Sequence, residues 1–476
     1  MLLRHGLIVM AVAAAVGGAG VALREDASTD GSVPGTNPVE ISTALPVSRR
    51  AEPSIDRYTW TDRATTPLKR MTSAQRWISA HARPFVAYDS APTVSRNLLG
   101  WATHPDIQVY VNAAGPNAYN RTGVRDAAKY LLKAGGQVVH VDGWDVIDIR
   151  NPDARHWWLY GSDGQASCTA DPSRRAALDL IACGYEGLWV DDVLTDPSWY
   201  TPNPRISAAQ WGDAEVALLR ELRAALPATA TFTINAHWTD VPYPSVAAAT
   251  PLLDPNSALV RAAATADQLV IEGGAIDAGL VYGGALADPY SYPRLLAYVD
   301  ALHAAGAHVQ YEKVNSGALV ASDPRRLGTP PPCSDQSYRR QPGWKVGSAA
   351  WKANVRASAF NLATALLTFT QGDGVGDICD YPGRSFRGYG QDLGLPLGDR
   401  ATNGPLVIRQ FSGGMVAVNP TLQPATVGLP PGRIGINLAS VAAKGKDDRT
   451  AASYAVGPRS AVIVQFSPAA AVATTP

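Results

Sequence analysis

Eight short apolar runs alternate with helical stretches between residues 83 and 374 of this 476-residue chain, and the alternation predicts an α/β fold. Eight strand–helix repeats are the number that closes a (β/α)8 TIM barrel. After Gly374 the chain changes to β-rich runs separated by turn residues, which predicts a small antiparallel β-sandwich. The length fits both parts, because a barrel of about 250 residues leaves room for a second module.

The runs that we interpret as strands are RPFVAYDS (83–90), IQVYVNAA (107–114), QVVHVDGW (137–144), YEGLWVDDV (185–193), TFTINAHW (231–238), QLVIEGGA (268–275), AHVQYEKVN (307–315) and LLTFTQGDG (366–374). Strands that alternate with helices pair in parallel through right-handed crossovers. An open doubly wound sheet is the rival arrangement. It normally carries a Gly-rich phosphate turn after its first strand, where this chain has YDSAPTVS.

Four segments between the runs have helical spacing: TGVRDAAKYLLKAG (122–135), ISAAQWGDAEVALLRELRAALP (206–227), SYPRLLAYVDALHAAG (291–306) and WKANVRASAFNLATAL (351–366). In the second segment, Leu218, Leu222 and Leu226 recur on one helical face. Near the C-terminus, PLVIRQFSGGMVAVNP holds two β-rich runs around SGG, which is a hairpin signal, and ATVGLPPG and SAVIVQFSP add short strands.

The chain divides into four expected segments. We expect a signal peptide or signal anchor over 1–23, a Ser/Thr/Pro-rich linker over 24–75, the barrel over 76–384 and the β-sandwich over 385–470. The positive MLLRH followed by the apolar stretch from Gly6 to Leu23 is typical of export. Cleavage after Ala22 would release the chain, whereas retention of the stretch would anchor it. The sequence therefore predicts a secreted or cell-envelope protein that meets a membrane only through this segment.

The charge balance gives no support for a nucleic-acid partner. Lys and Arg together number 41, as do Asp and Glu, so the formal net charge is zero and no basic cluster stands out. Twelve Trp and 18 Tyr supply flat amphipathic rings, which stack on sugars or fill the core. We therefore expect a polysaccharide or oligosaccharide partner and no nucleic acid.

The four cysteines predict two disulfides. An even count in an exported chain allows three pairings, of which proximity in the sequence favours Cys168–Cys183 and Cys333–Cys379. None of the four lies in a CxxC motif or a Cys/His cluster, so a structural zinc site is not expected.

The predicted strands end in polar residues that a purely structural strand would avoid. In chain order these residues are Asp89; Asn112; His140, Asp142 and Trp144; Asp191 and Asp192; Asn235 and His237; Glu272; His308, Gln310 and Glu312; Gln371 and Asp373. Side chains at alternate positions of a strand share one face. In a barrel that face is the interior, and the carboxyl ends of the strands form the mouth where active sites lie.

The stretch GLWVDDV (187–193) shows the same feature in its strongest form. Asp is a poor strand former, and two adjacent carboxylates repel each other. At the rim of a barrel, Asp191 can point into a polar pocket while Asp192 turns outward to cap or bond the following loop. The doublet therefore indicates a site rather than a structural strand end.

Two carboxyl groups across a scissile bond are what glycoside hydrolysis needs. We expect Asp191 to attack or stabilise the oxocarbenium-like centre and Glu272 to act as general acid/base, since its apolar neighbours in QLVIEGG favour a retained proton. Glu312 on the next strand is the rival acid. Structural alternatives remain open, because Asp191 could cap a helix and Glu272 could pair with Lys313 or Arg294.

The other strand-end residues suit recognition of a sugar. We expect a substrate-binding role for Asp89, Asn112, Asp142, Trp144, Asp192, Asn235, His237 and Glu312. His237 and His140 could form a metal site with Asp191, but no ligand spacing supports one, so we expect neither a metal nor a cofactor. Trp144, Trp189 and Trp238 are equally compatible with a stacking platform and with the core.

At this point the sequence resembles a known group. GYEGLWVDDV is similar to the G-[FY]-[DE]-G signature, ending in Asp-Asp or Asp-Asn, of hypothetical glycosyl hydrolase families in the TIM-barrel glycosidase superfamily. DVIDIRNPDARHWWL resembles the segment before their fourth strand, and DLGLPLGD with VIRQFSGGMVAVNP resembles their junction to a C-terminal β-sandwich. The resemblance covers roughly residues 80–470. It implies a retaining or inverting glycosidase acting on an envelope or extracellular polysaccharide, with its key aspartate at Asp191 and its sixth-strand acid at Glu272.

Together these observations predict an exported glycoside hydrolase that cleaves O-glycosidic bonds of an envelope or extracellular polysaccharide with two carboxylates. One alternative is a glycan-binding barrel without catalysis, which would bind glycans without releasing product. Another is a metal-dependent deacetylase, which a chelator would inactivate.

Overall fold

A computed structural model of the chain describes residues 85–87, 107–115, 125–141, 144–168, 175–197, 206–236, 254, 256–276, 291–313, 349–377, 388, 393–439 and 450–467. The predicted signal and linker (1–75) lie outside these residues, as do Cys333, Cys379, Asp89, Asp142 and His237. Within the described ranges no helix combines the length and the apolar character needed to cross a membrane.

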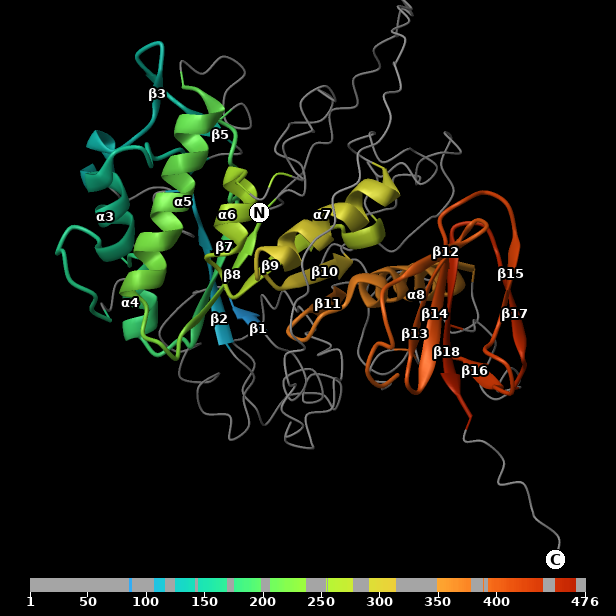
Figure 1. The fold of residues 1–476 in the computed structure, drawn as a ribbon. Coiled ribbons are helices and arrows are strands. Elements are labelled where there is room, and N and C mark those ends of the chain that lie inside the picture. Colours follow the sequence, from blue (N-terminus) through green and yellow to red (C-terminus); the bar gives the residue numbers. More distant parts are fainter. Residues whose placement is uncertain are drawn as a thin grey trace, which may run out of the picture. The chain divides into compact units, whose positions relative to one another are not determined.

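A parallel sheet forms the centre of the fold (Figure 1). Its strands, in spatial order, are β1 (Phe85–Ala87), β2 (Ile107–Asn112), β7 (Gly187–Asp191), β8 (Thr231–Asn235), β9 (Gln268–Glu272), β10 (Val309–Lys313) and β11 (Gly374–Asp377). All neighbouring pairs are parallel, as predicted. No pairing joins β1 to β11 in the described part of the chain, so the closed eight-stranded barrel stays a prediction.

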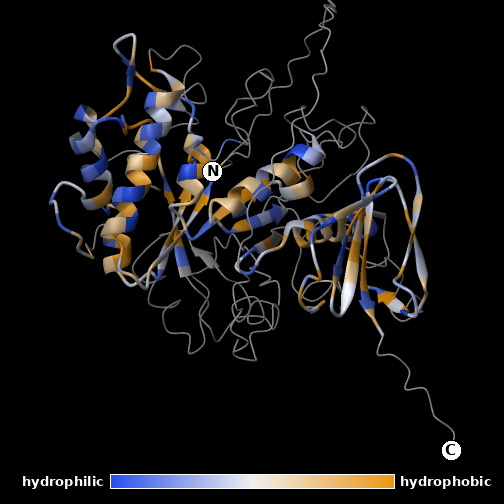
Figure 2. Cartoon of the chain, viewed as in Figure 1, coloured by the Kyte–Doolittle hydropathy of each residue, from blue (hydrophilic) through white to orange (hydrophobic). Residues whose placement is uncertain are grey.

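The helices are α3 (Pro152–Tyr160), α4 (Ala177–Ala182), α5 (Ala208–Ala225), α6 (Ala258–Ala263), α7 (Tyr292–Ala304) and α8 (Ala349–Thr368), with 3-10 turns η2 (Arg125–Lys129) and η7 (Gly274–Ile276). Ser207 begins α5 because its hydroxyl accepts from the Gln210 amide, and Gln210 returns a bond to Ser207. Leu218 and Leu222 are fully buried, as their spacing predicts. Hydrophilic and hydrophobic segments alternate along α5 (Figure 2), as an amphipathic helix requires.

The two faces of the sheet differ in chemistry. Alternate residues such as Leu188, Phe232 and Leu269 are buried in one hydrophobic cluster with the helices. The opposite face carries polar side chains, yet these are also buried: Gln108, Asn112, Thr233, Asn235, Gln268, Gln310 and Glu312. A polar face that is shielded from solvent is what the interior of the predicted barrel would produce.

The third predicted strand is wrong. QVVHVDGW (137–144) does not join the parallel sheet, and β2 pairs directly with β7. The segment instead contributes to two hairpins, β3 (Lys133–Ala134) with β4 (Gln137–Val138) and β5 (His140–Val141) with β6 (Trp144–Asp145). Gly135 and Gly136 both have positive φ, which suits the tight turn between β3 and β4.

The eighth predicted strand is displaced along the chain. Leu366 and Leu367 belong to the last turn of α8, and the strand begins only at Gly374. Asp373 therefore precedes β11 instead of ending a strand. Its carboxylate accepts from the amide of Val309 at 2.8 Å and pairs with His303 at 2.9 Å. The Asp373 side chain bonds residues at the amino end of the sheet. The predicted mouth is at the opposite end, where the strands have their carboxyl ends.

The C-terminal region is antiparallel, as predicted. One sheet has the order β12 (Ala401–Asn403), β13 (Leu406–Phe411), β14 (Gly414–Asn419), β18 (Ser460–Phe466), β16 (Gly435–Asn437); the other pairs β15 (Ala425–Gly428) with β17 (Ser453–Val456). Phe411 pairs with Gly414, so the hairpin turns at SGG. Met415, Ala417, Val427 and Val456 share a small core between the two sheets.

Helix α8 joins the C-terminal sheet to the rest of the fold. Phe360 of α8 lies in the same hydrophobic cluster as Val416 and Ile463, which project from β14 and β18 away from the small core. Arg409 of β13 donates to the carbonyl of Phe369 at 2.9 Å and also to carbonyls in the last turn of α8. A cation at this end of the helix also complements the helix dipole.

The side chain of Asn361 in α8 forms hydrogen bonds to two neighbouring elements, η7 and β10. Its side-chain oxygen accepts from the Ala275 amide at 2.8 Å, and its nitrogen donates to the Tyr311 carbonyl at 3.3 Å. The side chain is fully buried. Gly274 has a φ of 55°, and a Cβ there would lie 2.3 Å from the Asn361 oxygen, so this contact requires glycine.

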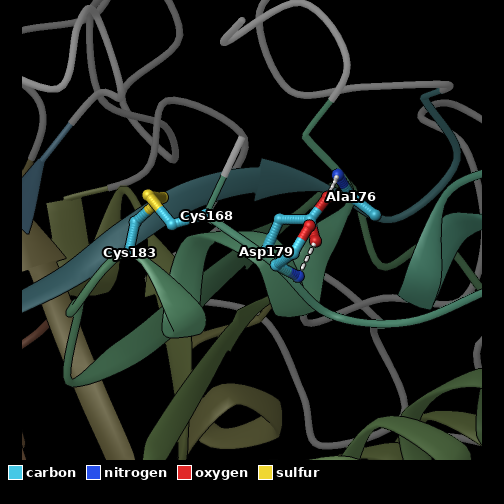
Figure 3. The surroundings of a disulfide bond; sticks show 5 residues. Cys168, Ala176, Asp179 and Cys183 are labelled. Carbon is cyan, nitrogen blue, oxygen red and sulfur yellow. Dashed lines mark hydrogen bonds between the residues drawn. A yellow bond between two sulfur atoms is a disulfide. The ribbon is translucent and has the colours of Figure 1, made fainter. Parts of the chain in front are cut away.

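One predicted disulfide is confirmed. Cys168 and Cys183 are bonded across a sequence separation of 15, with their Cα atoms 4.6 Å apart. Asp179 lies beside the bond, where its carboxylate accepts from the amides of Ser167 (2.6 Å) and Ala176 (2.8 Å) (Figure 3). These bonds hold the segment before α4 to the first turn of the helix. The Cys333–Cys379 pairing lies outside the described residues.

Replacement of Asn361 by Ala should lower the free energy of unfolding by about 2–4 kcal/mol. The buried N–H of Ala275 and the buried C=O of Tyr311 would each lose this hydrogen-bond partner. Denaturant unfolding measures the loss. Asn403→Ala, at an exposed position of β12, is the control and should change stability little. Equal stabilities for the two variants would show that Asn361 is not a structural link.

Loss of the Cys168–Cys183 bond in a Cys168→Ser/Cys183→Ser variant should destabilise the fold by about 3 kcal/mol, the chain-entropy value for a loop of this length. Thermal unfolding under non-reducing conditions tests this. A thiol titration of the native protein is the control. A variant as stable as the native chain would contradict a stabilising role.

Candidate active site at the carboxyl ends of the parallel strands

Three adjacent strands converge on the carboxylate of Asp191, the last residue of β7. The Tyr110 hydroxyl, from β2, donates to one oxygen at 2.5 Å. The Asn235 amide nitrogen, from β8, donates to the other at 2.8 Å. Asp191 itself is half-buried. Two donors on fixed strands orient the carboxylate and favour its ionised form.

Tyr110 remains a neutral donor. Burial raises the pKa of its phenol far above the ordinary value, and the negative charges of Asp191 and Asp192 raise it further. The ring stacks on Trp189 with centroids 5.4 Å apart. Because Trp189 is fully buried, this indole supports Tyr110 from within the protein and has no exposed ring for a sugar.

Asp192 leaves the strand with a left-handed backbone, at a φ of 54°. Asp tolerates this region better than most residues, although a non-glycine residue there still carries strain. The Asn112 amide nitrogen donates to the Asp192 carboxylate, and the Asn112 side-chain oxygen accepts from the Ala114 amide at 3.0 Å. Asp192 is thus bonded to the neighbouring strand β2, and the predicted cap or bond to the following loop stays a prediction.

The doublet therefore contributes to a network across neighbouring strands. Asp191 is linked to Tyr110 and Asn235, and Asp192 is linked to Asn112. Of the predicted site residues, the structure brings Asn112, Asp191, Asp192 and Asn235 together by direct bonds or along the chain. Asn112 is 6% exposed and its amide is engaged, which suits a positioning role.

Glu272 and Glu312 end adjacent strands in register. Glu272, the last residue of β9, pairs with Glu312 of β10, while Val270 pairs with Asn235 of β8. Alternation and register place Glu312 on the same face of the sheet as Asn235. Glu312 is 1% exposed. The side chains of Glu272 and Trp144, and the whole of Asp89, Asp142 and His237, lie outside the described residues, so their predicted roles stay predictions.

His140 takes no part in this network. Its ring bonds to Asp145 at 2.9 Å across the short β5–β6 hairpin, where both side chains are exposed. Among the described residues no three His, Cys, Asp or Glu side chains gather closely enough to hold a metal ion.

Sequence reasoning missed Tyr110 and Glu215. Tyr110 lies two positions before Asn112 and therefore shares its face of β2, so strict alternation along IQVYVN would have found it. Glu215 lies between Trp211 and Leu218 on the buried stripe of α5 and is fully buried. A glutamate at an apolar position of a helix was the available signal.

Comparisons of this chain with known proteins find matches among solved structures. No family model matches the chain, and no curated protein matches it. Among solved structures, Amy13B of Eubacterium rectale is 11% identical, and the match covers 69% of this chain and 66% of Amy13B with a TM-score of 0.36. The cyclic α-maltosyl-(1→6)-maltose hydrolase of Arthrobacter globiformis is 12% identical over 87% of this chain and 97% of its own, with a TM-score of 0.38.

A third solved structure is an inactive double mutant of MutB, a trehalulose synthase, in complex with isomaltulose. It is 11% identical and covers 89% of this chain and 100% of its own, with a TM-score of 0.44. The chain thus spans about two thirds of the length of Amy13B and nearly all of the length of the maltose hydrolase and of MutB.

The bond from Tyr110 to Asp191 should stabilise the fold mainly while Asp191 is ionised. Tyr110→Phe should cost about 1.5–3 kcal/mol near neutral pH, the usual value for a bond to a charged group, and less in acid where the carboxylate is protonated. Unfolding followed at both pH values measures the difference.

The control for this prediction is Tyr292→Phe. Tyr292 is buried, and its hydroxyl bonds to the neutral Thr364 at 3.0 Å. The stability cost of removing this hydroxyl should therefore be the same in acid as near neutral pH. If the two variants showed the same pH dependence, the Tyr110–Asp191 bond would not be a charge-dependent contact.

Proposed function

We propose that this chain is an exported glycoside hydrolase that cleaves O-glycosidic bonds of an envelope or extracellular polysaccharide with two carboxyl groups. The observation that carries the proposal is the half-buried Asp191 carboxylate, which Tyr110 and Asn235 hold at the carboxyl end of a parallel strand. Catalytic groups of barrel enzymes lie at this end of the sheet.

Asp191 is the carboxylate of the reaction. An ionised oxygen held at a fixed orientation can attack the anomeric carbon or stabilise the positive charge that develops there. Tyr110, which stays protonated, and Asn235 keep the carboxylate in place while the charge on the sugar changes. Their supporting strands make the site rigid before substrate arrives.

Glu272 is the proposed general acid/base. It ends β9, two strands from β7 in the parallel sheet. A proton donor must reach the leaving-group oxygen, and the almost complete burial of the rival acid Glu312 argues against that role for Glu312. Asn112, Asp192 and the remaining predicted polar residues at these strand ends would bind or position the sugar.

Export is supported by two observations. The apolar stretch from Gly6 to Leu23 follows a positive N-terminus. The Cys168–Cys183 disulfide is of the kind that persists in an oxidising compartment. A secreted or envelope location would also bring the site to extracellular polysaccharides.

A glycan-binding protein without catalysis is the second candidate. It is favoured by the engagement of both Asp191 oxygens with protein donors, since a nucleophile must release or share one of these bonds. Such a protein would bind glycans without releasing reducing sugar.

Asp191→Asn should abolish release of reducing sugar, with a fall in kcat of about 10³-fold or more, as for removal of other catalytic groups. The asparagine can still accept from Asn235 and donate to Tyr110, so Tm should change little. A reducing-sugar screen across bacterial and plant polysaccharides, run with native and variant protein, measures this.

Asp213→Asn is the matched control. Asp213 is an exposed carboxylate on α5, the helix that follows β7, and it pairs with Arg261 of α6. It should keep the native rate. Native turnover by Asp191→Asn would refute the catalytic assignment, and glycan binding without any product would favour the second candidate.

A further inference from the structure

Glu215 is a glutamate in the interior of the protein. It lies on α5, is fully buried, and neither of its carboxyl oxygens has a hydrogen-bond partner in the part of the chain that the structure describes. An ionised carboxylate without donors is very costly in such surroundings, whereas the neutral acid is tolerated. Burial accordingly raises its pKa well above the ordinary value, and the charge of Asp192 raises it further.

The other charges near Glu215 do not offset this cost. Arg261, Arg155 and Arg223 on α5 and its neighbours pair with Asp213, Glu221 and Asp267, respectively. Arg220, the other arginine of α5, is exposed. The surroundings of Glu215 therefore favour a bound proton.

The position of Glu215 connects it to the candidate active site. Asp192, whose charge acts on Glu215, has the left-handed backbone that ends β7. Asn112 holds the same carboxylate from β2. Trp211, one helical turn before Glu215 on the buried face of α5, donates from its indole nitrogen to the Leu194 carbonyl at 2.8 Å, so this face packs against the segment that follows Asp192. Asp191 is the residue before Asp192.

We propose that Glu215 is a positioning residue: as an uncharged carboxylic acid it adds no second negative charge near Asp192, and the turn that carries Asp192 and Asp191 therefore keeps its working geometry. Its complete burial prevents contact with a substrate, so it acts only through Asp192. Loss of its proton would place a second negative charge against Asp192 and push apart the turn that carries both aspartates. The catalytic part of this inference rests on the proposed glycosidase function, but the state of Glu215 does not.

The first test follows thermal unfolding of the full chain from about pH 4 to about pH 9. In the unfolded chain Glu215 loses its proton near the ordinary pKa of a glutamate. In the folded chain burial raises that pKa. The stability that Glu215 contributes is therefore fully present in acid. It is lost as the pH rises toward the raised pKa that Glu215 has in the folded chain. Glu215→Gln has no such titration, so its Tm relative to the native protein should climb by several degrees with pH.

Two further variants make this test specific. In an Asp192→Asn background the same climb should be smaller, because the like charge is gone while burial remains. Glu221→Gln removes a half-exposed carboxylate paired with Arg155 on the same helix, and it should show no climb. A difference between Glu215→Gln and native protein that is flat with pH would overturn the neutral acid.

The second test is the pH profile of reducing-sugar release on the glycan that the native protein hydrolyses. Glu215→Gln should extend activity to higher pH, since its side chain cannot ionise, and leave the acid limb in place. An unshifted alkaline limb together with the expected stability result would overturn the positioning role. If no glycan is hydrolysed, the proposed function fails, and the stability test still decides the state of Glu215.

Discussion

Every second side chain of a parallel strand enters the core beneath the helices, and the rest of this structure depends on that constraint. Leu188, Phe232 and Leu269 occupy the helix side, so Asp191 and Asn235 necessarily share the opposite face with Tyr110. Residues 81 and 44 positions away in the chain thereby become hydrogen-bond partners of Asp191. The same alternation that builds the apolar core assembles the polar site.

Several buried polar side chains join one element of the fold to another through hydrogen bonds. Asn361, Asp373 and Asp179 each accept from backbone amides, and each joins an element to a neighbour. Glu215 differs because it is equally buried but lacks such partners in the described residues. Buried polar groups without partners are rare in proteins and call for an explanation, and here the explanation is a carboxyl group that keeps its proton.

Asp191 and Glu215 lie in different environments, one half-buried and hydrogen-bonded and the other fully buried. Asp191 receives two donors and is favoured as a carboxylate, whereas Glu215, close to Asp192, is favoured as the acid. Environments that separate the proton affinities of nearby acids are typical of acid–base sites. The left-handed turn at Asp192 lies between the two environments and connects the strand to the helix that follows.

Local patterns in the sequence determined the parallel strands, the antiparallel C-terminal region and the position of Asp191 at a strand end. Proximity in the sequence favoured the Cys168–Cys183 bond among three possible pairings. Tertiary structure alone decided that QVVHVDGW leaves the sheet, that Asp373 lies at the amino end, and that Tyr110 grips Asp191. It also decided that Glu215 is buried without partners. Local pattern indicates which face a side chain takes, but register and hydrogen-bond partners arise from contacts between distant segments.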